Sequence, residues 1–303
     1  MPISLSLGGR PGRAMHSIGS PRPDEGNRMA GSGTALFTDP TDYETSVAFM
    51  RYLLPLKEGE FRARCTWVAL PHIRLFRASE AVGRIGSMAL PADRIHVMFQ
   101  SRSGPPLLHC GMEMRRGEFV LQAPGQRFHQ RVPAGSHWGC IAIASSLLGE
   151  CARILTGEPI EAPMFGRIYR PCASDRERLL RLHAEACRIT ETRLTNIGHP
   201  EVSRALEQDL IWSLVTCLAP ESKTISAGRR EATEIVLQCE DALNSAPGLP
   251  VTVKTLCRAT QVSERRLRAA FMVILGLSPG LYLRLRRSRR PNRGDPCRAR
   301  QIL

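Results

Sequence analysis

Short apolar runs separated by turn residues dominate the chain between residues 61 and 145. About eight runs follow one another at a spacing of roughly ten residues, which is typical of the strands of a β-barrel or β-sandwich. The expected strands cover residues 64–70, 73–77, 85–89, 95–100, 107–114, 118–122, 128–132 and 138–144. Apolar side chains occupy both alternating sets of strand positions, so the pattern does not show which side chains point into the barrel.

After residue 145 the apolar positions recur at helical spacing. The expected helices cover residues 147–155, 174–194, 200–218 and 229–244. Ser174 opens a capping-box sequence, and Pro200 suits the first position of its helix. The second and third of these helices could pair with their copies in another subunit or merely cover the barrel, and the pattern leaves both interpretations open.

Residues 252–287 read as short helices joined by tight turns. Thr252 can cap the first helix, and the apolar pattern breaks at Gln261. Ser263 then offers a second N-cap, followed by Glu264 in the first turn, where a carboxylate suits the positive helix end. These signals predict two helices around a turn.

The second helix of this unit is amphipathic. Leu267, Phe271 and Ile274 recur at helical spacing and form one apolar stripe. The other face carries Arg265, Arg266, Arg268, Ala269 and Met272. Gly276 stops the helix, and Ser278 followed by proline starts another. The whole is a helix-turn-helix whose second helix has a basic face, the geometry needed to enter a DNA major groove.

Residues 252–287 also resemble the first helix-turn-helix of the AraC/XylS transcription regulators. The matching residues are Leu256-Cys257-Arg258-Ala259, Val262-Ser263-Glu264-Arg265, Leu267-Arg268, Phe271, Gly276, Ser278-Pro279 and Tyr282-Leu283. The chain departs from the family at Gln261, where the family has glycine. If that position needs a positive φ, glutamine costs roughly 1 kcal/mol more than glycine.

The resemblance implies an α+β fold: an N-terminal cupin-like β-barrel with covering helices, followed by a small all-α helix-turn-helix DNA-binding domain. The phrase from Gly117 to Gly125, followed by His129, is similar to the second cupin motif with altered spacing. The resemblance also implies the DNA contacts. Arg265, Arg268 and Ala269 would face base edges, and Ser263 and Arg266 would meet the backbone.

The basic charge is concentrated at the C-terminal end. The whole chain carries a formal charge of +14. Residues 251–303 hold 13 Lys and Arg against Glu264 and Asp295, so this segment contributes 13 − 2 = +11. A charge localised in this way is typical of a segment that binds a polyanion.

Composition changes predict five parts of the chain. They are a disordered arm (1–34), a sensor and dimerisation domain (35–220), a linker (221–228), an incomplete DNA-binding domain (229–287) and a basic irregular tail (288–303). AraC-type domains carry a second helix-turn-helix. Here Pro291, Gly294 and Pro296 end any helix, and residues 297–303 are too few for another unit. We therefore expect a C-terminal truncation; the alternative is a basic tail that replaces the missing unit by phosphate contacts alone.

Nothing in the sequence points to catalysis. His96, His109, His129 and His137 are isolated, with no H-x-H pair of the kind that metal-dependent cupins need. Nucleophile-elbow, zincin, phosphate-loop and dinucleotide motifs are absent. We expect neither an enzyme nor a metal or cofactor site. The ten scattered cysteines suit a reducing cytosol, and no apolar run is long enough for a membrane span.

The expected function is sequence-specific binding of double-stranded DNA to regulate transcription, controlled by an N-terminal domain that senses a small-molecule effector and forms a homodimer. The expected location is the cytoplasm, at the nucleoid. The alternative is an effector-binding or dimerising protein that has lost specific DNA binding. A cupin-type enzyme is a third and weaker interpretation.

Overall fold

The computed structural model describes residues 31–47, 49–57, 59–192, 199–219, 222–224, 227–245 and 251–288. The N-terminal part contains β1 (Gly33–Phe37), α1 (Pro40–Ser46), β2 (Met50–Pro55), β3 (Ala63–Ala69), β4 (Ile73–Glu80), β5 (Arg84–Ala89), β6 (Arg94–Gln100), β7 (Leu107–His109), β8 (Met112–Met114), β9 (Phe119–Gln122), β10 (Arg127–Val132) and β11 (Ser136–Ala144). It continues with α2 (Ser145–Thr156), β12 (Arg167–Tyr169), α3 (Ala173–Thr192), α5 (Pro200–Leu218) and β13 (Ser222–Thr224). The C-terminal helices are α6 (Ala227–Ser245), α7 (Val253–Thr260), α8 (Glu264–Leu275) and α9 (Pro279–Ser288).

The strands form two antiparallel sheets that enclose a core. The large sheet has the order β1-β3-β4-β11-β6-β9-β12-β13, and the small sheet has the order β2-β5-β10-β7-β8. Apolar side chains from both sheets meet between them, among them Phe76, Met98 and Trp138 from the large sheet and Met88 and Phe128 from the small one. The fold is therefore α+β with a cupin-like barrel, as the sequence predicts.

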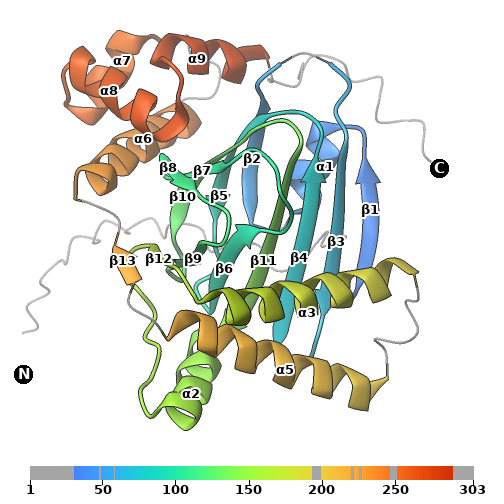
Figure 1. The fold of residues 1–303 in the computed structure, drawn as a ribbon. Helices are drawn as coiled ribbons and strands as arrows, with labels where there is room; N and C mark the ends of the chain where they lie inside the picture. The colour runs from blue at the N-terminus through green and yellow to red at the C-terminus, as the bar shows by residue number, and fades with distance from the viewer. Residues whose placement is uncertain are drawn as a thin grey trace, which may run out of the picture.

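Each sheet also buries its outer face. Val97 and Ile141 of the large sheet pack against α2, α3 and α5, whereas Tyr52, Leu54 and Ile85 of the small sheet pack against α6–α9. Figure 1 shows α3 and α5 crossing one face of the barrel, and α6–α9 gathered beyond β2, β7 and β10. Because both faces of the strands are covered, apolar residues fill the outward positions as well as the inward ones.

The predicted strands and helices agree with the structure at most positions, with exceptions at the 107–114 strand and at β12, for which the sequence predicts no strand. Residues 107–114 form the hairpin β7–β8 rather than one strand, because Cys110 (φ 47°) and Gly111 (φ 69°) turn the chain. The predicted linker, 221–228, includes β13, which pairs with β12, and the first residues of α6. The predicted disordered arm, 1–34, lies outside the described residues except at its end, where β1 begins at Gly33.

In the part of the chain that the structure describes, no single helix is long and apolar enough to cross a membrane. Helices α8 and α9 have the length and apolar composition of a membrane span only when taken together, and they are bent by 63° relative to each other. The predicted basic tail beyond residue 288 also lies outside the described residues.

Candidate DNA-binding surface

Capping residues set the ends of α7 and α8. The Thr252 hydroxyl accepts a hydrogen bond from the backbone N–H of Thr255, and the Thr255 hydroxyl accepts one from Thr252, which completes a capping box. Ser263 caps α8 by accepting from the N–H of Arg266 at 3.3 Å. Gly276 ends α8 in the left-handed conformation, with φ 63°. The caps that the sequence predicts for α7 and α8 are present, whereas Ser174, predicted to open its helix, lies inside α3, which begins at Ala173.

The turn between α7 and α8 carries a strained residue. Gln261 has φ 54° and ψ 29°, in the left-handed region that disfavours any residue with a Cβ. The condition under which glutamine is costly here, a positive φ, is therefore met. Glutamine fits the turn at a cost of roughly 1 kcal/mol relative to glycine.

A small core holds the two helices at their mutual angle. Leu256 of α7 and Leu267 and Phe271 of α8 are buried together with Val236 of α6 and Tyr282 of α9. The Phe271 and Tyr282 rings meet edge to face, with their centroids 5.3 Å apart. With its apolar stripe buried in this way, α8 has to turn its other face outward.

All five predicted DNA-contact residues are exposed. These residues are Ser263, Arg265, Arg266, Arg268 and Ala269. Arg268 forms a salt bridge one turn back to Glu264, and Arg266 forms one to Glu231 of α6. Within the described residues Arg265 takes part in no salt bridge, so its guanidinium is the one of the three most available to a partner.

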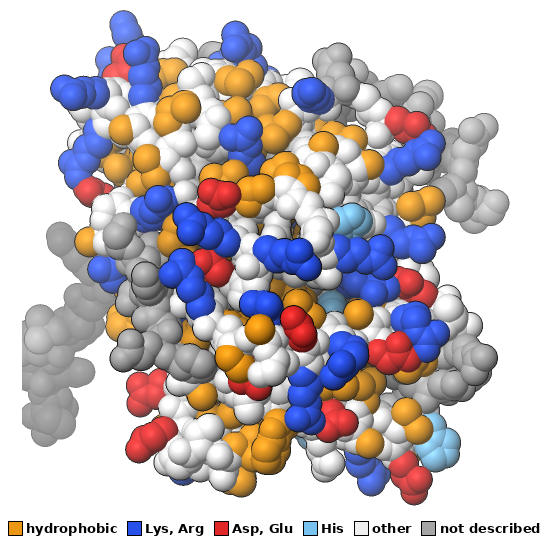
Figure 2. All heavy atoms as spheres, viewed as in Figure 1, with side chains coloured by type: hydrophobic (Ala, Val, Ile, Leu, Met, Phe, Trp, Pro, Cys, Tyr) orange, Lys and Arg blue, Asp and Glu red, His pale blue; other side chains and the backbone are white. Residues whose placement is uncertain are grey.

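The surface around α8 is strongly positive. Residues 251–288 carry eight Lys and Arg and one acidic residue, which gives 8 − 1 = +7. Lys254, Arg258, Arg284 and Arg287 are exposed in addition to the arginines of α8. Figure 2 shows Lys and Arg side chains projecting from this end of the molecule. Such a field attracts DNA phosphates and weakens with added salt.

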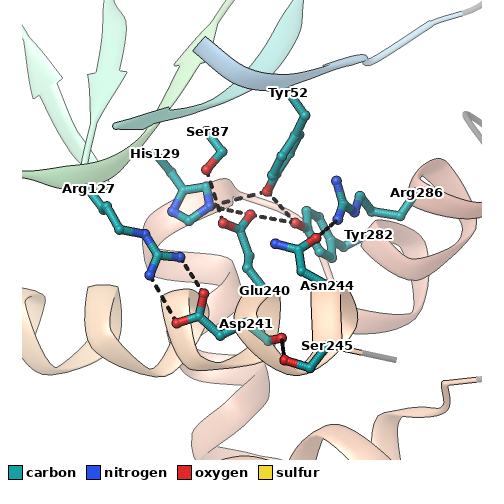
Figure 3. A network of polar contacts seen from close by, with 10 residues as sticks. All are labelled: Tyr52, Ser87, Arg127, His129, Glu240, Asp241, Asn244, Ser245, Tyr282 and Arg286. Carbon is teal, nitrogen blue, oxygen red and sulfur yellow. Dashed lines mark hydrogen bonds and ion pairs between the residues drawn. The ribbon is translucent and has the colours of Figure 1, made fainter. Parts of the chain in front are cut away.

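A buried polar cluster joins these helices to the barrel (Figure 3). Glu240 of α6 is 1% exposed, and its Oε1 lies 2.7 Å from Nε2 of His129 on β10. The same oxygen accepts a hydrogen bond from the Tyr282 hydroxyl at 2.7 Å, and Oε2 accepts one from Ser87 at 3.0 Å. The hydroxyls of Tyr52 and Tyr282 are also hydrogen-bonded to each other. We call Tyr52, Ser87, His129, Glu240 and Tyr282 the Glu240 cluster.

Burial sets the protonation of this cluster. It raises the pKa of Glu240 to about 8, against the opposing effects of the Tyr282 hydrogen bond and of Arg286 and Arg51. Burial lowers the pKa of His129 to about 3, assisted by Arg127 and Arg286. Both groups are therefore uncharged at neutral pH, and the carboxyl O–H donates to Nε2 of His129. A neutral pair avoids the large cost of burying two charges.

Contacts around the Glu240 cluster extend the junction. Arg127 of β10 makes a bidentate pair with Asp241 of α6, at 2.7 and 3.0 Å, and the Arg286 guanidinium lies 4.2 Å from the Tyr52 ring centroid. Gly111 (φ 69°) packs so closely that a Cβ there would collide with the carbonyl of Val273 in α8. The C-terminal end of α8 thus rests on the barrel, while its N-terminal turns stay exposed.

The barrel histidines do not converge. His96, His109 and His129 are buried and His137 is partly exposed. Among the described residues, no group of three or more His, Cys, Asp or Glu side chains is placed to hold a metal ion.

Sequence reasoning missed the Glu240 cluster. One signal was available, because Glu240 lies on the same face of its helix as Val236 and Cys239, both of which are buried. A carboxylate on a buried face needs partners. Its partners come from β2, β5, β10 and α9, so their identity depends on the tertiary fold.

No protein-family model and no curated protein sequence matches the chain. Solved structures with a similar fold include the AraC-like transcriptional activator CuxR. CuxR is 17% identical to this chain, and the match covers 85% of this chain and 94% of the CuxR chain, with a TM-score of 0.45. ToxT from Vibrio cholerae is 9% identical to this chain, and the match covers 70% of this chain and 97% of the ToxT chain, with a TM-score of 0.28.

A cupin 2 conserved barrel domain protein from Rhodopseudomonas palustris is 15% identical to this chain. It covers 44% of this chain and 83% of its own, with a TM-score of 0.22. At these scores the similarities do not assign a function, which depends instead on the surface and contacts described above.

Proposed function

We propose that this protein binds double-stranded DNA through α8 and regulates transcription at the nucleoid, with the N-terminal barrel as its ligand-sensing and dimerising part. The main observation is the exposed basic face of α8 on a capped helix-turn-helix. Arg265, Arg268 and Ala269 are the residues proposed to face base edges. Ser263 and Arg266 are proposed to meet the backbone, with the N-terminus of α8 towards the phosphates.

Two magnitudes bear on specificity. A good bidentate contact between arginine and a base contributes roughly 1–3 kcal/mol of discrimination, whereas arginine–phosphate contacts contribute affinity without sequence information. One short helix reads few bases. Two copies on one DNA would restore specificity, because the second helix then binds at a high effective concentration.

Helix α5 offers a surface for such pairing. Trp212 is 49% exposed and Val202 is 46% exposed, both on the side of α5 that faces away from the barrel core. Covering these two side chains in a contact between subunits would remove their apolar surface from water. We propose that this surface contributes to a homodimer.

The test is selection of duplexes from a random-sequence pool by the full-length protein, followed by affinity measurements on the enriched and scrambled duplexes at several salt concentrations. The proposal expects an enriched sequence that is bound at least tenfold more tightly than its scrambled version. If no sequence is enriched and all duplexes bind equally with a steep salt dependence, the alternative applies, in which specific DNA binding has been lost.

A further inference from the structure

Two adjoining cavities open on the outer face of the large sheet beside α3. One, of about 250 Å³, lies between the strands and the C-terminal half of α3, and Arg64 and Arg77 line it. The other, of about 440 Å³, has Arg116 and Arg176 in its wall. Both cavities include Ser101 and Arg102, so they form one concave surface. We call Arg64, Arg77, Arg102, Arg116 and Arg176 with Ser101 the arginine groove.

The arginine groove has more positive charge than its own acids neutralise. Its five arginines face only Glu177 and Glu191 in the lining, which leaves 5 − 2 = +3. Arg77 is paired with Glu191 at 2.6 Å, while Arg176 and Glu177 are 3.8 Å apart and Glu177 is 72% exposed. Figure 2 shows Lys and Arg side chains crossing the middle of this face, near α3.

Three of the arginines carry the excess. Arg64, Arg102 and Arg116 are exposed and form no salt bridge with any residue that the structure describes. Guanidinium groups gathered in a concavity repel one another unless an anion lies between them. Their planar donors match the oxygens of phosphate, which they can bind through two parallel hydrogen bonds.

Ser101 marks the centre of the arginine groove. Its backbone N–H donates to the carbonyl of His137 at 3.2 Å, which holds the backbone at this position. Its Oγ is buried and has no hydrogen-bond partner among the described residues. An unsatisfied buried hydroxyl is costly unless a water molecule or a ligand supplies the missing partner, and Ser101 lines both cavities.

Gly117 leaves room for Arg176 in the wall of the larger cavity. Gly117 has φ 88°, and a Cβ at that position would come within 2.9 Å of Nη1 of Arg176. The absence of a side chain therefore lets the Arg176 guanidinium lie flat against the β8–β9 turn. Burial and the nearby Arg102 lower the pKa of His137, so its ring is neutral at pH 7 and adds a hydrogen-bonding group without repelling the arginines.

We propose that the arginine groove binds a small organic phosphate with two phosphoryl groups, one in each cavity, with Arg102 and Ser101 between them. Two cavities and a net charge of +3 match two anionic groups better than one. The combined space is within the range of small-molecule sites. The proposal that the arginine groove is the sensing site of a regulator rests on the proposed function. The binding of a ligand in the groove does not depend on that function, and it is measured without DNA.

The experiment is isothermal titration calorimetry on the full-length protein with four probes: inorganic phosphate, pyrophosphate, fructose 1,6-bisphosphate and adenosine 3′,5′-bisphosphate. At least one spaced bisphosphate is expected to bind tenfold or more tightly than inorganic phosphate. Arg102→Ala is expected to weaken that binding at least tenfold. Arg188→Ala is the matched control, because Arg188 is an exposed arginine on α3 that pairs with Glu185 outside the arginine groove.

Ser101→Ala separates binding from folding. Removing an unpartnered buried hydroxyl should leave the melting temperature unchanged or higher, yet weaken bisphosphate binding several-fold. The proposal is overturned if no probe binds with a Kd below 1 mM, or if Arg102→Ala and Arg188→Ala weaken binding equally. It is also overturned if Arg102→Ala lowers DNA affinity while bisphosphate binding is unchanged, because the arginine groove would then be a DNA contact.

Discussion

The Glu240 carboxyl offers a direct test of how the DNA-binding helices are held against the barrel. Replacing Glu240 by glutamine keeps the size of the side chain but removes the titratable proton. The amide N–H can donate to His129 while the single carbonyl oxygen accepts from Ser87, so the hydrogen bond from Tyr282 is lost. Because the cluster joins α6, α9 and the barrel strands, the state of this carboxyl bears on the stability of the whole junction. The glutamine protein should fold normally near pH 6 and differ from the wild type at higher pH.

The size of the stability change follows from the difference between the pKa of Glu240 in the folded protein and in the unfolded chain. The folded protein holds the Glu240 proton up to about pH 8, whereas the unfolded chain releases it near 4.5, so stability falls as pH rises through this window. His129 acts oppositely: its pKa is lowered to about 3 from 6.5, and stability rises with pH up to 6.5. Above pH 6.5 the Glu240 effect therefore stands alone, and it amounts to roughly 1.5 kcal/mol between pH 6.5 and 8.

The assay is thermal unfolding of wild type and Glu240→Gln at several pH values between 6.5 and 8. The melting temperature of the wild type should fall by about 3–6 °C relative to that of the glutamine protein as the pH rises over this range. Asp241→Asn is the control, because Arg127 lowers the pKa of that carboxyl and its titration lies below the window. Melting curves of wild type and Glu240→Gln that stay parallel from pH 6.5 to 8 would refute the assignment of a protonated Glu240.

Three further changes test other parts of the structure. Gln261→Gly should raise stability by up to about 1 kcal/mol in denaturant unfolding, because Gln261 has φ 54°; a lower stability would contradict the strained turn. Glu80→Gln should lower the free energy of unfolding by roughly 3–5 kcal/mol, because the buried Glu80 carboxylate accepts from Nε and Nη2 of Arg84 at 2.7 and 2.8 Å. A loss below 1 kcal/mol would show that the pair is dispensable. Gly111→Ala should speed hydrogen exchange in α8 relative to α3, because its Cβ would collide with Val273; unchanged exchange would mean that α8 does not depend on this contact.

Local signals in the sequence predicted the helices well. Thr252, Ser263 and Gly276 act on the residues next to them, so their capping roles can be recognised without knowing the fold. The strands were also predicted, but their orientation was not. Val97 packs against the covering helices and Met98 points between the sheets, and both are apolar because both faces are buried.

The polar features that join distant segments could not be predicted. Glu240 and His129 are 111 residues apart in the chain. The arginine groove likewise collects side chains from β3, β4, the β6–β7 and β8–β9 connections and α3. Neither group has a spacing pattern, because tertiary packing alone brings its members together. The candidate DNA-contact residues were found because one helix carries them all.

The measurement that tests the central claim most directly compares Arg265→Ala with Arg188→Ala, each as full-length protein, on an enriched duplex and its scrambled version. If α8 reads base edges, Arg265→Ala weakens binding to the enriched duplex by roughly 5- to 150-fold and binding to the scrambled one much less. Arg188→Ala, which removes the same charge from an exposed site on α3, should leave the ratio of the two affinities unchanged. An equal loss on both duplexes for Arg265→Ala would contradict sequence reading by α8.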